Sequence, residues 1–166
     1  SVLESIAREL SDDIWIAAPE VEQSGQSRSI TLTQPVRTRE VREKCWAVMG
    51  TPTDCVLLAV HELMDGKPDL ILSGVNRGQN IAEDTSLSGT IAGAMFGMHL
   101  GVPSIALSQA QSFRERGSLP WETSKQWGGK VLCADGQFEG MPGERGRFWS
   151  LTPPNLVVPD GQFILT

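Results

Sequence analysis

Three short stretches of this 166-residue sequence contain side chains that bind anions or hard cations. Ser88-Gly89-Thr90 opens a predicted helix, where free backbone N–H groups, two hydroxyls and the positive end of the helix dipole suit a phosphate group. The same tripeptide also suits an ordinary helix cap, which is a common role of Ser and Thr at this position. The tripeptide by itself therefore leaves phosphate binding and simple capping both open.

The other two stretches are polar segments rich in Asn, Ser and Gly. Ser73 to Asn80 follows a buried apolar run and contains Asn76 and Asn80, whose side-chain carbonyl oxygens suit Mg²⁺, Mn²⁺ or Ca²⁺. An Asx turn, with Gly supplying positive φ, is the alternative interpretation. Gln23 to Ser27 offers hydroxyls on a flexible backbone, or is a solvated loop.

Several other chemistries lack the residues that they need. The sequence contains no Gly-x-x-x-x-Gly-Lys phosphate loop, no nucleophile elbow and no histidine-based triad, and it has only two histidines. Asp12-Asp13 looks like a paired-carboxylate metal site. However, it precedes a predicted strand and so falls at the sheet edge opposite the three stretches, and we interpret it as a solvated turn.

The elements that must position these stretches alternate between buried strands and helices. Apolar runs predict parallel strands at 14–18, 45–49, 69–74 and 104–108. Helices are predicted at 52–64, where Thr51 and Asp54 form a capping box, and at 88–100. This order predicts a Rossmann-like, doubly wound, three-layer α/β fold with a mostly parallel sheet, whose ligands lie at the carboxyl ends of the strands.

The remaining segments predict less regular structure within one domain, residues 1–166. We expect a short strand or hairpin over 29–39 and polar loops over 75–87 and 109–120. A helix over 121–133, a Gly-rich linker over 134–147 and one or two edge strands within 148–166 complete the prediction.

The composition excludes some partners. Lys plus Arg number 14 against 20 for Asp plus Glu, so the net charge is −6, which disfavours a nucleic-acid polymer or a membrane surface as partner. Three cysteines without C-x-x-C spacing predict neither a disulfide framework nor a zinc site. With no run of about 20 apolar residues and no export signal, we expect a cytoplasmic protein.

Five motifs, in their order and spacing, resemble the stationary-phase survival protein E family, SurE. They are Ala18-Pro19-Glu20, Ser24-Gly25-Gln26-Ser27, Gly50-Thr51-Pro52-Thr53-Asp54-Cys55-Val56, Pro68 to Asn80, and Ser88-Gly89-Thr90. The resemblance is strong over 1–108, whereas 109–166 diverges. It implies a divalent-metal-dependent nucleotidase that removes phosphate from nucleoside 5′- and 3′-monophosphates.

The resemblance also implies roles for particular residues. Ser24 and Asn76 match the metal-binding Ser and Asn of the family, which suggests one Mg²⁺ or Mn²⁺ per subunit. Ser88, Gly89 and Thr90 match its phosphate-binding tripeptide. Asn80 lies where a second Asn approaches the substrate.

Family members begin with a strand that leads into Asn-Asp-Asp-Gly, whose aspartates bind the metal, and this sequence starts downstream of that motif. We therefore assign no catalytic residue and expect impaired hydrolysis and weak metal binding, with Glu83 or Asp84 as acids that could complete the site. The alternative is a non-catalytic phosphate- or nucleotide-binding module, or a structural fragment. Because the family forms homo-oligomers through C-terminal segments that this chain mostly lacks, we expect a weaker assembly.

Overall fold

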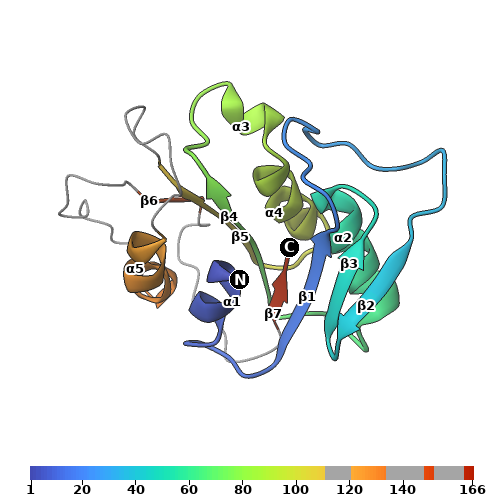
Figure 1. The fold of residues 1–166 in the computed structure, drawn as a ribbon, viewed down its shortest axis with the longest axis horizontal. Coiled ribbons are helices and arrows are strands. Elements are labelled where there is room, and N and C mark those ends of the chain that lie inside the picture. Colours follow the sequence, from blue (N-terminus) through green and yellow to red (C-terminus); the bar gives the residue numbers. More distant parts are fainter. Residues whose placement is uncertain (111–120, 134–147, 152–162) are drawn as a thin grey trace.

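A mixed sheet forms the centre of the computed structural model, which describes residues 1–110, 121–133, 148–151 and 163–166 (Figure 1). Its strand order is β2-β3-β1-β7-β4-β5-β6. The strands are β1 (Ile14–Pro19), β2 (Thr38–Arg42), β3 (Cys45–Val48), β4 (Leu70–Arg77), β5 (Ser104–Gln109), β6 (Phe148–Leu151) and β7 (Phe163–Leu165). Only the edge strands β2 and β6 pair antiparallel with their neighbours among the described pairings.

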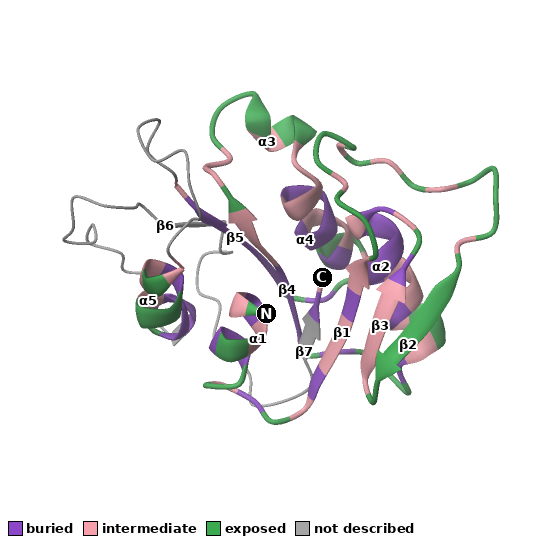
Figure 2. Cartoon of the chain, viewed as in Figure 1, coloured by how far each residue is buried: buried purple, intermediate pink, exposed green. Residues whose placement is uncertain are grey.

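Helices cover both faces of the sheet, so the molecule has three layers (Figure 2). Helices α1 (Val2–Ala7) and α5 (Glu122–Cys133) pack against one face, and α2 (Pro52–Leu58) and α4 (Gly89–His99) pack against the other. Successive residues of β4 serve the two layers alternately: Leu70 and Leu72 join the α1/α5 core, whereas Ile71 joins the α2/α4 core. The predicted α/β fold with a mostly parallel sheet is confirmed.

Local sequence signals place α2 well. Thr51 Oγ1 accepts a hydrogen bond from the Asp54 backbone N–H at 3.1 Å, and an Asp54 carboxylate oxygen accepts one from the Thr51 N–H at 2.8 Å. This is the predicted capping box, with Pro52 at the first helical position. The helix continues into a π-helical turn over Ala59–Leu63. The predicted range 52–64 is thus helical almost throughout.

The strand predicted over 29–39 is wrong for most of that range. Regular pairing begins only at Thr38, where β2 runs antiparallel to β3. Upstream, the Thr31 backbone N–H donates to the buried Asp54 carboxylate at 3.0 Å instead of to a neighbouring strand. Capping of α2 therefore competes with sheet pairing and holds this segment in an irregular conformation.

The loop predicted over 75–87 is also wrong at both ends. Strand β4 continues to Arg77, because Asn76 and Arg77 pair with Ser108 and Gln109 of β5 beyond a register shift after Ser73. Gln109, expected at the start of a polar loop, is accordingly buried. A short helix, α3 (Asp84–Leu87), closes the range.

The C-terminal strands differ most from expectation. β6 is an edge strand as predicted, but β7 lies in the middle of the sheet between β1 and β4. The Thr166 N–H donates to the Leu72 carbonyl and the Gly74 N–H donates to the Thr166 carbonyl, both at 3.1 Å. A short apolar run carries no local signal for centre or edge, so the prediction could not distinguish them. Residues 111–120 of the loop predicted over 109–120, and the linker predicted over 134–147, lie outside the described residues.

Candidate functional site

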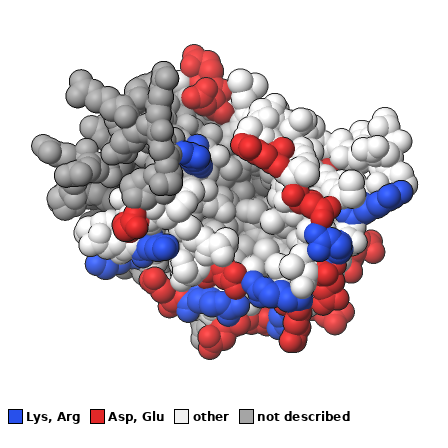
Figure 3. Space-filling model, viewed as in Figure 1, with Lys and Arg blue, Asp and Glu red and all other residues white. Residues whose placement is uncertain are grey.

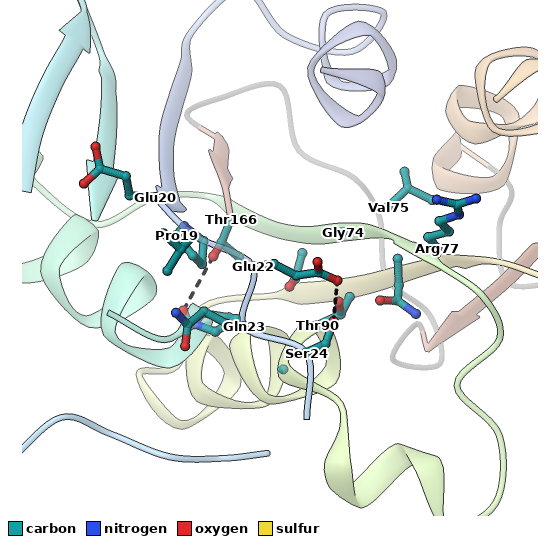
Figure 4. A pocket seen from close by; sticks show the side chains of 15 residues that line it. Pro19, Glu20, Glu22, Gln23, Ser24, Gly74, Val75, Arg77, Thr90 and Thr166 are labelled. Atoms are coloured by element: carbon teal, nitrogen blue, oxygen red, sulfur yellow. Dashed lines mark hydrogen bonds between the residues drawn. The ribbon is translucent and has the colours of Figure 1, made fainter. Parts of the chain in front are cut away.

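A cavity of about 440 Å³ opens where β1, β7 and β4 end and where α2 and α4 begin (Figure 4). This is the carboxyl edge of the parallel strands, the usual ligand position in doubly wound sheets. All three polar stretches identified in the sequence contribute to its lining. The lining residues are Pro19, Glu20, Val21, Glu22, Gln23, Ser24, Pro52, Ser73, Gly74, Val75, Asn76, Arg77, Gly89, Thr90 and Thr166.

Ser24 lies in the segment that follows β1, next to an acidic side chain. Its hydroxyl donates a hydrogen bond to a carboxylate oxygen of Glu22 at 2.8 Å, and both residues line the cavity (Figure 4). The hydroxyl proton is thereby engaged, which leaves the Ser24 oxygen lone pairs available to a cation. The site thus contains a carboxylate that our sequence analysis did not single out.

Asn76 reaches the cavity because β4 is irregular. The pairing of β4 with β5 shifts register between Ser73 and Asn76, and irregularities of this kind re-aim side chains at the rim of a sheet. At Gly74, φ is +128°, and a Cβ there would collide with the Leu107 carbonyl oxygen, so only glycine fits. The Asn76 side-chain N–H donates to the Gly78 carbonyl at 3.0 Å, which fixes the amide and leaves its oxygen as an acceptor.

The start of α4 forms part of the cavity wall. Ser88 is the N-cap residue, and its hydroxyl oxygen accepts a hydrogen bond from the Ile91 N–H at 3.3 Å. Gly89 and Thr90 line the cavity. A Cβ on Gly89 would lie 3.0 Å from Pro52 Cγ. The glycine therefore permits close packing between the starts of α2 and α4, a reason that our sequence analysis did not consider.

Asn80 lies beyond β4, outside the residues that line the cavity. Its side-chain N–H donates to the Ser108 hydroxyl at 2.7 Å. The suggested contact between Asn80 and the substrate stays a prediction. The two acids expected to complete the metal site, Glu83 and Asp84, are exposed residues at the start of α3 and do not line the cavity either.

A buried carboxylate fastens residues 29–31, downstream of Ser24, to the start of α2. Asp54 accepts hydrogen bonds from the Thr31 hydroxyl at 2.7 Å and from the Thr31 and Thr51 N–H groups. Thr51 in turn donates its hydroxyl to the Ser29 carbonyl at 2.7 Å. Burial alone would raise the pKa of Asp54, but these hydrogen bonds outweigh it and hold the pKa below its ordinary value of 3.8.

Charge around the cavity is mixed. Glu20 and Glu22 bring carboxylates to the lining and Arg77 brings a guanidinium group. Glu20 forms an ion pair with Arg39 of β2. Figure 3 shows Lys and Arg side chains interspersed with Asp and Glu along the lower edge of the molecule, where β1 begins, so the mixture of charges is general. An anionic ligand therefore depends on local donors more than on the field of the whole molecule.

Asp13 lies at the amino end of β1, far along the strand from the cavity. It accepts from Lys44 Nζ at 2.7 Å and from the Trp15 ring N–H at 3.0 Å. These contacts place the Asp12-Asp13 pair in a helix-to-strand turn, as we had interpreted it from the sequence.

The oxygen donors in the cavity fit a hard divalent cation in kind. Glu22, Ser24 and Asn76 supply a carboxylate, a hydroxyl and an amide oxygen, the donor types that Mg²⁺ and Mn²⁺ prefer. Across the part of the chain that the structure describes, no three His, Cys, Asp or Glu side chains gather as a metal site. Of the three donors, the Ser24 hydroxyl and the Asn76 amide are neutral, and only the Glu22 carboxylate carries a charge.

Thr166 and Pro52 are lining residues that the sequence did not suggest. Thr166 follows β7 at the carboxyl edge, and its hydroxyl lies 3.5 Å from the Pro52 carbonyl oxygen (Figure 4). Only the central position of β7 brings it there. Glu22 stands two residues before Ser24, directly upstream of the stretch Gln23 to Ser27, so its position in the sequence could have pointed to it.

The fold and cavity together define an α/β protein with a polar ligand site at the carboxyl edge of its parallel strands. A family model described as "Survival protein SurE" matches residues 1–160. The chain belongs to the SurE family.

Individual relatives agree with this assignment. A 5′-nucleotidase SurE of Hyphomonas neptunium is 75% identical over 132 residues, covering 80% of this chain and 52% of the relative. One of Caulobacter vibrioides is 57% identical over 132 residues, covering 78% and 50%. The crystal structure of SurE from Aquifex aeolicus superposes with a TM-score of 0.69 at 37% identity, covering 79% of this chain and 52% of that one. The chain spans about half the length of the curated relatives it matches.

None of the helices in the described ranges has the length and hydrophobicity of a membrane span.

Proposed function

We propose that this chain is the phosphate- and metal-binding part of a SurE-type nucleotidase that acts on nucleoside 5′- and 3′-monophosphates. One observation carries the proposal: a single cavity joins Ser24, Asn76 and the start of α4 in a chain of the SurE family. Relatives that bear the name 5′-nucleotidase SurE support the substrate class.

In this proposal the start of α4 binds the phosphate group. Backbone N–H groups of the first turn have no partner within the helix, and the helix dipole adds positive potential there. Ser88, Gly89 and Thr90 stand at this turn, with the Thr90 hydroxyl as an additional donor. Arg77 contributes a positive charge to the lining. Asn80 would approach the substrate from the loop beyond β4.

Glu22, Ser24 and Asn76 would hold one Mg²⁺ or Mn²⁺ per subunit. When bound, such an ion supplies Lewis-acid polarisation of a phosphoryl oxygen. The Glu22 carboxylate orients Ser24 by accepting a hydrogen bond from its hydroxyl. The Gly78 carbonyl orients Asn76 by accepting a hydrogen bond from its side-chain amide. The protein thus prepares the oxygen donors before the ligand arrives, which reduces the cost of ordering them.

Binding without efficient turnover is the second candidate, and the charge inventory of the cavity favours it. Glu20 is engaged by Arg39, which leaves Glu22 as the lining carboxylate directed to the predicted metal ligand. One carboxylate neutralises a divalent cation only in part. We therefore propose that hydrolysis by this chain is impaired.

The free thiols of Cys45 and Cys55 support a reducing compartment, the cytoplasm.

A binding measurement with inorganic phosphate tests the proposed recognition of phosphate at the start of α4. We expect inorganic phosphate to bind with a free energy of about −4 to −6 kcal/mol, the high micromolar to millimolar range. Thr90→Val keeps the shape of the side chain but removes a hydroxyl, and should cost about 1 kcal/mol. Thr38→Val, on the exposed edge strand β2, is the matched control. Isothermal titration or phosphorus NMR measures both.

Equal affinity of wild type and Thr90→Val, or no binding to wild type, would contradict phosphate recognition at α4. Gly89→Val is a less suitable probe because its side chain would also press on Pro52. Ser88 caps α4 through Ile91 and is not among the lining residues. If its hydroxyl also contacts the phosphate, Ser88→Ala should weaken binding by about 1 kcal/mol, whereas unchanged affinity would leave it the role of a helix cap.

Turnover is tested by phosphate release from adenosine 5′- and 3′-monophosphate with Mn²⁺. Because Thr166 lines the cavity, an Asn-Asp-Asp-Gly segment added after it would enter the site directly. The matched control carries Asn-Asn-Asn-Gly. We expect the acidic extension to accelerate hydrolysis above both the control and the unextended chain. Equal rates in all three proteins, with phosphate still bound, would favour binding without turnover.

A further inference from the structure

Two buried polar residues end β5, beside the strand that carries Asn76. Ser108 is 4% exposed and Gln109 is 2% exposed. Their partners in β4 are Asn76 and Arg77, beyond the register shift of that strand. A polar side chain in the core costs free energy unless it is hydrogen-bonded, so both side chains need partners. These partners connect the end of β5 to the candidate site.

The Gln109 side chain is anchored to α5. Its amide oxygen Oε1 accepts a hydrogen bond from the Ser124 hydroxyl at 2.5 Å and another from the Ser124 backbone N–H at 3.2 Å. Ser124 is 0% exposed and lies in the first turn of α5, where N–H groups have no partner within the helix. Two donors that are shielded from water and converge on one acceptor fix the Gln109 side chain in a single orientation.

The Gln109 backbone holds the turn that follows β4. Its carbonyl oxygen accepts a hydrogen bond from the Gly78 N–H at 2.9 Å. Gly78 has a φ of +107°, and its own carbonyl oxygen accepts from the Asn76 side-chain N–H at 3.0 Å. The neighbouring Ser108 hydroxyl accepts from the Asn80 side chain at 2.7 Å. The end of β5 therefore receives one hydrogen bond from each end of the turn 78–80.

We propose that Gln109 is a positioning residue for the metal-binding amide of Asn76. Ser124 fixes the Gln109 side chain, the Gln109 carbonyl holds Gly78, and the Gly78 carbonyl orients Asn76. Neither Gln109 nor Ser124 lines the cavity, so both act only through other residues. The proposal rests on the proposed function, because it takes the metal-binding role of Asn76 from it.

Two substitutions remove parts of this connection. Gln109→Met keeps the length of the side chain but removes the acceptor of both Ser124 donors, whereas Ser124→Ala removes only the hydroxyl. Leu132→Ala is the matched control, because it truncates a buried residue of the same helix and makes none of these hydrogen bonds. The control should destabilise the fold without moving the Asn76 amide.

Manganese affinity, measured by paramagnetic broadening of NMR signals, is the first measurement. We expect it to fall about tenfold in Gln109→Met and about threefold in Ser124→Ala, as supporting partners of metal ligands do. Leu132→Ala should stay within about twofold of wild type, and so should the affinity of all three variants for inorganic phosphate, which is bound at a separate element. General loosening of the fold would weaken both ligands together.

The side-chain amide of Asn76 provides a second measurement that needs no metal. In the metal-free protein, its hydrogen-bonded proton should exchange with water about tenfold faster in Gln109→Met than in wild type, and at the wild-type rate in Leu132→Ala. The double variant Gln109→Met/Ser124→Ala should be no more impaired than Gln109→Met, because Ser124 acts through Gln109.

Unchanged Mn²⁺ affinity and unchanged Asn76 exchange in Gln109→Met would overturn the positioning role. Equal losses in Leu132→Ala, or additive losses in the double variant, would overturn it too. A wild-type chain that binds no Mn²⁺, but whose Asn76 exchange still depends on Gln109, would uphold the positioning contact and overturn the metal site of the proposed function. If Gln109→Met does not fold, Ser124→Ala provides the same test, because it retains the Gln109 side chain.

Discussion

At the scale of single residues, Glu22 adds a carboxylate beside the predicted metal ligands, which are neutral. The sequence offered Ser24 and Asn76, both neutral, and suggested acids on α3 to complete them. The structure instead places the Glu22 carboxylate 2.8 Å from the Ser24 hydroxyl, inside the cavity lining. One formal negative charge at this position is the main electrostatic attraction that the site offers to a divalent cation.

Replacement of Glu22 by Gln should weaken Mn²⁺ binding by about tenfold or more, because a charged oxygen donor becomes neutral. The glutamine carbonyl can still accept from Ser24, so the loop geometry is preserved. Stabilisation by a ligand grows as RT ln(1 + [L]/Kd), so the Mn²⁺-induced rise in Tm should shrink. Glu83→Gln on α3 is the control. Equal Mn²⁺ shifts in the two variants would show that Glu22 does not bind the ion.

Asp54 stabilises the fold through its ionised form. Asp54→Asn should cost about 1–3 kcal/mol of unfolding free energy, since donors on Thr31 and Thr51 lose a charged acceptor. The folded-state pKa lies below the ordinary value of 3.8, so this contribution is present above 3.8 and is lost as the pH falls toward the folded-state pKa. The destabilisation measured by urea denaturation should therefore be full near neutrality and smaller in acid. An exposed control, Asp65→Asn, should change little at either pH. A pH-independent difference between Asp54→Asn and wild type would contradict this role.

At the scale of elements, β7 decides how the sheet closes. It pairs in parallel with β1 on one side and with β4 on the other, and it joins two strands distant in sequence. Leu165 is 2% exposed and belongs to the core under α1 and α5. The same strand delivers Thr166 to the cavity, so stability and site geometry depend on one short element.

Leu165→Ala should destabilise the protein by about 2–5 kcal/mol, the usual cost of truncating a buried leucine. Leu32→Ala, at a position 86% exposed, should change stability by less than about 0.5 kcal/mol. Urea denaturation followed by circular dichroism measures both variants. Comparable stability of the two would mean that β7 does not hold the centre of the sheet.

At the scale of the whole molecule, the net charge opposes self-association. A chain with a formal charge of −6 repels its own copies at low salt. We expect a monomer or a weak, salt-dependent dimer in analytical ultracentrifugation, with association favoured when salt screens the repulsion. A stable tetramer at low ionic strength would contradict this expectation.

The sequence by itself determined the layered α/β architecture and the edge of the sheet at which the candidate site lies. Buried strands contain short apolar runs, such as 105–107 within β5, because both faces of the sheet are covered. Thr51-Pro52-Thr53-Asp54 marks a helix start by local hydrogen bonding alone. These signals act over a few residues, so they can be recognised without knowledge of distant contacts.

Only the tertiary structure decided which strand lies in the middle of the sheet and which acid stands beside Ser24. β7 is a short apolar run whose neighbours, β1 and β4, lie far away in the chain, and its pairing depends on closing long loops. Asp54 likewise fixes the segment upstream of β2 through Thr31, a contact between a loop residue and a helix cap 23 positions away. Non-local hydrogen bonds of this kind leave no periodic pattern in the sequence, and they set the final positions of the site residues.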